Sequence, residues 1–185
     1  MENFLVEAKK LAYNETKKNG TPPIPIINLS TEIGKRIAKE LGASVEIVEA
    51  GTLLMDCALG QALKENRRAE HIKMSFDKAK KLLEKFSLTE EEKENILHCI
   101  LEHHGASKFY SLESEICCNA DCYRFLSIKG FIFQVKYGRD MSFEDMTDLL
   151  KEKVDEKWNA LSLDIPKKEL KSQYKLIIEI LKNLK

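Results

Sequence analysis

The stretch Ala50-Gly-Thr-Leu-Leu-Met-Asp-Cys-Ala-Leu-Gly-Gln-Ala-Leu63 holds a single carboxylate, Asp56, in an otherwise apolar run. The run is typical of a core helix, which Ser44 can cap and which should extend to about Leu63. A carboxylate inside a helical core is costly unless it is paired with a cation or coordinates a metal ion. The rest of the sequence must therefore supply Asp56 with such a partner.

Nearly every other segment also has apolar residues at helical spacing. No segment alternates apolar and polar residues between turn signals, so we predict almost no β-sheet. Residues 19–25 should form a loop, because Asn-Gly and several prolines break helices. We expect an all-α single domain over residues 1–185. The predicted helices span residues 3–18, 29–41, 44–63, 69–86, 89–104, 111–137, 142–158 and 164–184.

The overall composition does not favour several classes of partner, and it leaves open a local basic patch. Lys and Arg number 30 and Asp and Glu number 30, so there is no global basic field for nucleic acid or an anionic membrane surface. No apolar stretch reaches the roughly 20 residues of a transmembrane helix. The five cysteines lie in apolar helical contexts without a preceding secretory signal, so we expect reduced thiols and a cytoplasmic protein. Cys117, Cys118 and Cys122 lack the Cys-x-x-Cys spacing of a zinc knuckle. They are better explained as small side chains of the core than as zinc ligands.

Two adjacent imidazoles end the predicted helix 89–104. His104 lies on the same face as Leu97, Ile100 and Leu101, and His103 flanks that apolar stripe. Both side chains should therefore lean toward the core, either as structural histidines bonded to the backbone or carboxylates, or as metal ligands. Because Asp56 is an isolated core carboxylate in the same chain, the two interpretations are about equally supported.

His71 and Asp121 are further candidates for the same site. His71 begins the predicted helix 69–86, where it is either an exposed first-turn residue or a ligand. Asp121 is the one acid in another apolar helix, and Arg124, three residues later, could simply pair with it. Three basic residues near His71 could bind phosphate oxygens, although such residues more often form a solvated basic face. They are Arg67, Arg68 and Lys73.

Four segments, in this order, resemble motifs of the HD superfamily of metal-dependent phosphohydrolases. The first, Ala-Gly-Thr-Leu-Leu-Met-Asp-Cys-Ala-Leu-Gly, is similar to the family's Ala-Ala-Leu-Leu-His-Asp-Ile-Gly, with Asp56 at the Asp position. The others are similar to the family's His-x-x-x-Ser, Ile-x-x-His-His and Glu-x-x-x-x-x-Ala-Asp segments. The four segments are residues 50–60, 71–75, 100–105 and 114–121.

This resemblance implies an HD-type helical bundle. It covers about residues 26–126, with the N-terminal helix and the helices of residues 141–185 packed on that core. The sequence departs from the family in two places. Met55 replaces the His of the His-Asp doublet, and residues 25–30, which should carry the first His, contain none.

The departures divide the metal site that the resemblance implies. The usual single-metal position would keep Asp56 and Asp121 but lose both of its imidazoles. The second-metal position of two-metal members would keep all its ligands, which correspond to Asp56, His71, His103 and His104. The metal ligands that we expect are Asp56, His71, His103, His104 and Asp121, with Asp56 and Asp121 also taking catalytic roles. Mixed imidazole and carboxylate ligation suits Fe, Mn, Zn, Co or Ni.

The leading hypothesis is a metal-dependent phosphohydrolase that acts on a phosphate ester such as a nucleotide, with a partial metal site. The rival hypothesis is a catalytically inactive HD relative that serves as a nucleotide sensor or a protein-interaction module. A third is a helical scaffold whose last helix binds a partner, although the apolar stripe of that helix is better explained as core. The sequence also leaves open assembly of the chain into a homo-oligomer.

Overall fold

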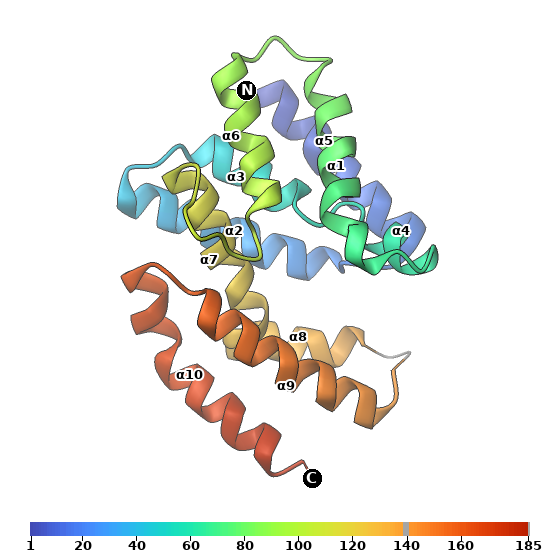
Figure 1. Cartoon of the computed structure of the whole chain (residues 1–185), viewed down its shortest axis with the longest axis vertical. Coiled ribbons are helices and arrows are strands. Elements are labelled where there is room, and N and C mark those ends of the chain that lie inside the picture. Colours follow the sequence, from blue (N-terminus) through green and yellow to red (C-terminus); the bar gives the residue numbers. More distant parts are fainter. Residues whose placement is uncertain (139–140, 185) are drawn as a thin grey trace.

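The computed structural model describes residues 1–138 and 141–184, and these form helices joined by short loops (Figure 1). No β-strand occurs within the described ranges, so the predicted all-α fold is confirmed. None of the described helices is long and apolar enough to cross a membrane. The elements are α1 (Glu2–Asn19), α2 (Ile24–Leu41), α3 (Val45–Leu54), α4 (Leu59–Lys64), the 3₁₀ helix η1 (Arg68–Glu70), α5 (His71–Leu83), α6 (Glu90–Leu101), α7 (Leu112–Leu126), α8 (Ile128–Tyr137), α9 (Phe143–Ala160) and α10 (Asp164–Lys182).

Helix α7 lies at the centre of the molecule. It packs against α2, α3, α6, α8, α9 and α10, and in Figure 1 it joins the upper group of helices to α8, α9 and α10 below. Every residue from 116 to 124 is buried, so α7 is enclosed all round rather than on one face. Its two charged residues in that stretch, Asp121 and Arg124, therefore need partners inside the protein.

The predicted helix 44–63 is broken beside Asp56. Helix α3 ends at Leu54, a turn spans residues 55–58, and α4 begins at Leu59. In the turn, the N–H of Cys57 bonds to the carbonyl of Leu54, and the N–H of Ala58 donates to the hydroxyl of Ser75 at 3.1 Å. The helical hydrogen-bond pattern is thus lost where α5 offers a side-chain acceptor, and Asp56 lies in a turn instead of a helix.

The predicted helix 111–137 is also two helices, α7 and α8. The Ser127 hydroxyl caps α8 by accepting from the N–H of Gly130 at 3.0 Å. A Cβ on Gly130 would lie 2.2 Å from the carbonyl oxygen of Tyr123, so only glycine allows α8 to fold back so closely on the end of α7. Gly130 therefore marks close packing of α8 against the end of α7.

Helix α2 begins earlier than predicted. It starts at Ile24, with Pro23 as its N-cap and Pro25 in its first turn. Proline is tolerated there because the first N–H groups of a helix have no intrahelical partner. Ser44 accepts a backbone N–H as its predicted cap, Ser111 and Ser142 cap α7 and α9 in the same way, and Thr89 and Glu92 form a capping box on α6.

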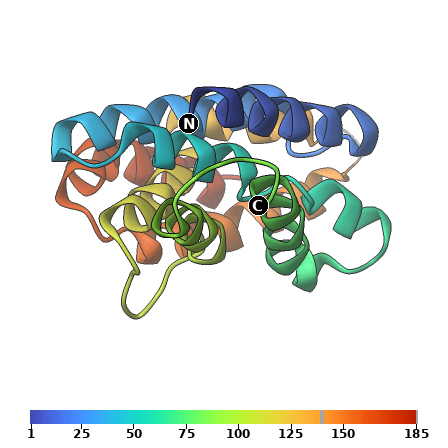
Figure 2. The ribbon, with the colours of Figure 1, turned by 90° about the horizontal axis from the view of Figure 1, so that it is seen from above.

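The C-terminal helices α9 and α10 pack on α7. The apolar stripe of α10 is core, as predicted, because Leu170, Ile177 and Leu181 are buried. The ring of Tyr174 stacks on Trp158 of α9, with 4.2 Å between the centroids. Seen from above, α9 lies on the opposite side of the bundle from α1 and α2 (Figure 2). This arrangement lets α9 supply residues to a site that α3, α5, α6 and α7 also border.

Candidate metal centre

Five segments that are far apart in the sequence bring charged and imidazole side chains together. Asp56 comes from the turn after α3, and His71 is the first residue of α5. His103 and His104 follow the end of α6. Helix α7 supplies Asp121 and Arg124, and α9 supplies Glu156 and Lys157. Salt bridges and close contacts join these residues into one cluster, which divides into two halves at Asp56.

The histidine half consists of Asp56 Oδ1 and the side chains of His71, His103 and His104. Asp56 Oδ1 lies 3.6 Å from His71 Nε2 and 3.5 Å from His103 Nε2. One ligand atom from each of the three imidazoles lies within 4.8 Å of the other two. The structure brings these four predicted ligands together, with the three imidazoles in one group and Asp56 beside His71 and His103.

Both imidazoles that face Asp56 have their other nitrogen occupied. His71 Nδ1 lies 2.8 Å from the carbonyl oxygen of Arg68, and His103 Nδ1 lies 2.7 Å from that of Ile100. Because a carbonyl oxygen can only accept, each Nδ1 carries the hydrogen, and a neutral ring then presents a lone pair at Nε2. Within the described part of the chain, Asp56 Oδ1 and His103 Nε2 have no hydrogen-bond partner. When both rings are neutral, three acceptors therefore face one another with no donor between them.

Burial keeps two of the imidazoles uncharged. It lowers the pKa of His71 below its usual range, against the opposing effect of Asp56. Burial, together with nearby His103 and Lys157, lowers the pKa of His104 to about 3. Neutral imidazoles are the form that binds metal ions, so these two rings need not lose a proton to do so near neutral pH.

The acidic half consists of Asp56 Oδ2, Asp121, Arg124 and Lys157. Arg124 Nη1 donates to Asp56 Oδ2, and also to Asp121 Oδ1 at 2.7 Å. Lys157 Nζ lies 2.7 Å from Asp121 Oδ2. Both oxygens of Asp121 are therefore engaged by cations, and one of them is held by the Arg124 partner that the sequence spacing had suggested.

Strong coupling between buried charges holds the acidic half fully ionised. Burial opposes ionisation of Asp121, but Lys157 and Arg124 lower the pKa of its carboxyl below the usual range. Burial likewise opposes the charge on Asp56, and Arg124 brings its pKa well below the usual range. The same contacts raise the pKa of Arg124 and of Lys157 despite their burial.

The cluster reaches solvent at His104 and Glu156, whose side chains are 33% and 31% exposed. Glu156 Oε1 lies 3.4 Å from His104 Nδ1 and 3.3 Å from Lys157 Nζ, and its other oxygen pairs with Lys153. His103 and Lys157 are almost completely buried. A ligand would therefore approach from the rim formed by His104 and Glu156.

The predicted phosphate-binding residues lie on the outside. Arg67 pairs with Glu65 and Glu70, and Lys73 pairs with Asp77. Arg68 is exposed, and its carbonyl oxygen accepts the hydrogen bond from His71. Their role in binding phosphate stays a prediction.

Sequence reasoning missed Glu156 and Lys157. Helix α9 buries Thr147, Leu150, Val154 and Lys157, which follow one another by three or four residues. A lysine in register with an apolar stripe is a signal that could have marked a buried cation. This pattern does not identify the partner of Lys157, because Asp121 lies 36 residues earlier in the sequence.

A divalent metal ion fits the histidine half and does not fit the acidic half. Metal–ligand bonds of about 2.1 Å place two ligands of a tetrahedral site roughly 3.4 Å apart, close to the 3.5 and 3.6 Å between Asp56 Oδ1 and the two imidazoles. In the histidine half, Asp56 Oδ1 and His103 Nε2 have lone pairs that no donor among the described residues satisfies, and such lone pairs can bind a divalent metal ion. In the acidic half, two protein cations already hold the carboxylate oxygens.

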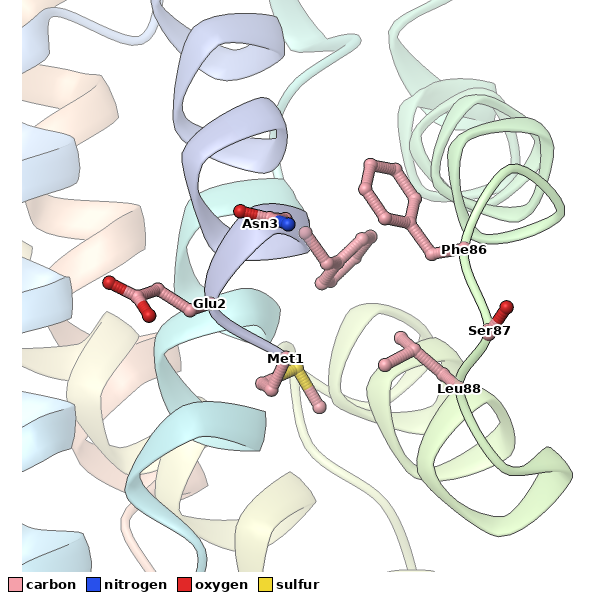
Figure 3. Close-up of a pocket in the computed structure, with 7 residues that line it drawn as sticks. Met1, Glu2, Asn3, Phe86, Ser87 and Leu88 are labelled. Carbon is pink, nitrogen blue, oxygen red and sulfur yellow. The ribbon is translucent and has the colours of Figure 1, made fainter.

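A separate pocket of about 300 Å³ lies at the N-terminus, between the start of α1 and the loop from α5 to α6 (Figure 3). Phe4 and Phe86 meet edge to face in its wall, with 5.4 Å between their centroids. Glu2 is the one charged residue of its lining. Its other polar side chains are those of Asn3 and Ser87, and among the described residues its lining includes no histidine, cysteine or basic side chain.

No family model matches the sequence, and no curated protein matches it. Solved structures do match. A crystal structure described as a predicted HD superfamily hydrolase, from an uncultured Thermotogales bacterium, aligns with a TM-score of 0.69 and 14% identity, over 96% of this chain and 88% of that chain. This chain has the HD fold.

Two crystal structures of YpgQ from Bacillus subtilis also resemble this HD fold. One aligns with a TM-score of 0.70 and 13% identity, over 98% of this chain and 94% of that chain. The other, in complex with ADP, aligns with a TM-score of 0.68 and 14% identity, over 96% and 95% of the two chains. Within the HD fold of this chain, Met55 is buried beside Asp56 in the turn, and residues 25–30 lie in α2.

Proposed function

We propose that this HD-fold protein binds one divalent metal ion in the histidine half and uses it to bind and hydrolyse a phosphate ester such as a nucleotide. The observation that carries the proposal is the convergence of Asp56 Oδ1, His71 Nε2 and His103 Nε2 without a donor between them. His104 is the fourth ligand. Three imidazoles and one carboxylate suit Zn, Fe, Mn, Co or Ni.

The charges around the site favour an anionic ligand only when the ion is bound. In the connected cluster, three carboxylates face three side-chain cations, so these charges balance. Imidazole ligands are neutral, and a divalent ion would leave the cluster with a net positive charge. A phosphate group at the rim would restore the balance. The charged residues are Asp56, Asp121, Glu156, Arg124, Lys153 and Lys157.

Each residue then has a defined task. A bound divalent ion supplies Lewis acidity toward a phosphoryl oxygen and lowers the pKa of a water molecule. Asp56 would hold the ion through one oxygen, while Arg124 fixes the other and so sets the orientation of the carboxylate. Glu156, a partly exposed carboxylate beside His104, is itself paired with Lys153 and Lys157, so it would accept a proton from an attacking water only after one of these ion pairs opens. Asp121 acts through Arg124 and Lys157.

A nucleotide is the first ligand to test, because YpgQ, which has the same fold, has been crystallised with ADP. A second candidate function is nucleotide binding without hydrolysis. It is favoured by one observation, that both oxygens of Asp121 are engaged by cations, so this carboxylate is not free to act as a base. Binding of ADP without measurable turnover of any phosphate ester would support this second function.

The test is elemental analysis of the purified protein after incubation with Mn²⁺, Ni²⁺ or Zn²⁺ and removal of unbound metal. We expect about one ion per chain, lost in an Asp56→Ala/His104→Ala double variant. His98→Ala is the matched control, because His98 instead pairs with Glu102 and stacks on Tyr110. A metal-loaded protein would then be assayed on phosphomonoesters and phosphodiesters. Wild-type protein that takes up no metal would refute the proposal.

A further inference from the structure

Arg124 lies between two carboxylates that come from different elements. Its Nη1 donates to Asp56 on one side and to Asp121 on the other. Lys157, from α9, contacts the remaining oxygen of Asp121 at 2.7 Å. All four side chains are at most 8% exposed, so solvent does little to screen these charges.

The two cations supply the charge that two buried carboxylates require. A guanidinium and an ammonium together carry the same charge as a divalent ion. Two carboxylates and two cations are thus neutral as a group, and the neighbouring contacts leave both oxygens of Asp121 engaged. Arginine cannot be deprotonated in a protein, so Arg124 cannot make room for a metal ion by losing its charge.

We infer that Arg124 and Lys157 permanently take the place of a metal ion between Asp56 and Asp121, so the site holds one ion on the histidine side and Asp121 is not a ligand. The inference rests on the proposed function for that one ion. It assigns Asp121 the role of a positioning residue, which holds Arg124 against Asp56. It also makes α9 part of the centre, because Lys157 and Glu156 both come from this helix.

A displacing ion would face a high cost. It would have to expel the guanidinium and the ammonium from contacts of 2.7 Å, and both cations would then need new partners in a buried environment. The acidic half also has no imidazole of its own among its four residues. Two carboxylates alone would bind the ion only weakly.

The first experiment compares metal uptake by Asp121→Asn and His71→Ala with that of the wild-type protein. Titration with Mn²⁺, followed by elemental analysis, should give one ion for the wild type. Asp121→Asn should also bind one ion, with an affinity within about tenfold of the wild type, whereas His71→Ala should lose it. His98→Ala again serves as the control. Two ions in the wild type, or loss of the ion in Asp121→Asn, would overturn the inference.

The second experiment does not depend on the histidine-side ion. Lys157→Met keeps the length of the side chain but removes its charge, which leaves the Asp121 carboxylate short of a cation. We expect the melting temperature to fall by roughly 10 °C. Millimolar Mn²⁺ should recover part of this loss even in Lys157→Met/His71→Ala, while His71→Ala alone should not respond.

The two experiments separate the inference from the proposed function. If the wild-type protein binds no ion, the proposed function fails, and the Mn²⁺ response of Lys157→Met/His71→Ala decides the inference alone. A Lys157→Met protein as stable as the wild type would overturn it. So would a double variant whose melting temperature is unchanged by Mn²⁺.

Discussion

The histidine half and the acidic half of the centre share Asp56 but satisfy its two oxygens in different ways. Oδ2 is held by a permanent cation, Arg124, whereas Oδ1 faces imidazole nitrogens without a donor. The acidic half is the more completely buried of the two, at most 8% exposed against 33% for His104, so burial alone does not make a metal site. The difference lies in the chemistry of the partners. Protein cations, Arg124 and Lys157, already neutralise the acidic half, whereas the converging lone pairs of the histidine half can bind a metal ion.

The largest effect should come from removing the cation that both carboxylates share. Arg124→Met would leave Asp56 and Asp121 buried with uncompensated charge, which costs about 3–5 kcal/mol of unfolding free energy. Arg36→Met is the matched control, since its ion pairs with Glu40 and Glu169 are exposed and should contribute less than about 1 kcal/mol. Urea unfolding followed by circular dichroism measures both. Equal losses would contradict the assignment of a structural role to Arg124.

Metal removal should have the next largest effect. An ion present at about 100 times its dissociation constant stabilises the folded state by roughly 2.7 kcal/mol, and a chelator should abolish that gain. For a chain of this length, the melting temperature should then change by about 5–10 °C. Thermal melts with Zn²⁺ or Mn²⁺, before and after EDTA, measure the change. His71→Ala should show no difference between the two conditions, and a difference of wild-type size would place the ion elsewhere.

Binding of ADP should require the ion, because the charges of the cluster balance without it. We expect the affinity for ADP to fall at least tenfold when the metal is removed, which corresponds to about 1.4 kcal/mol. Isothermal titration calorimetry on metal-loaded and metal-free protein measures this change. An affinity independent of the metal would mean that ADP binds through other residues, for which Arg67, Arg68 and Lys73 are candidates.

The smallest effect should come from restoring an imidazole at position 55. Met55→His introduces a potential ligand beside Asp56, but Arg124 already holds the oxygen on the acidic side. Metal stoichiometry should therefore stay at about one ion per chain, as elemental analysis can determine. Met55→Leu, which has a similar volume and no donor atom, controls for repacking of this buried position. A second ion in Met55→His would show that the cations of the acidic half can be displaced.

Local sequence patterns predicted most of the helices. Apolar spacing and caps, such as the Thr89–Glu92 box, act over a few residues and can be read along the chain. The two breaks that patterns did not predict, at residues 55–58 and at Ser127, depend on contacts made by distant or folded-back groups. At residues 55–58, the hydroxyl of Ser75 accepts a hydrogen bond from the N–H of Ala58. At Ser127, Gly130 allows the close fold-back of α8 because it has no Cβ.

The sequence by itself determined an all-α HD fold and grouped Asp56, His71, His103 and His104 as candidates for one site, because their residue types and order are local properties of four segments. Only the tertiary structure decided how the two oxygens of Asp56 are divided. Lys157 and Glu156 come from a helix outside the region of resemblance, and their partners are separated from them by many residues. Distance, burial and charge balance arise when the helices pack, so no pattern along the chain could reveal that protein cations fill one half of the centre.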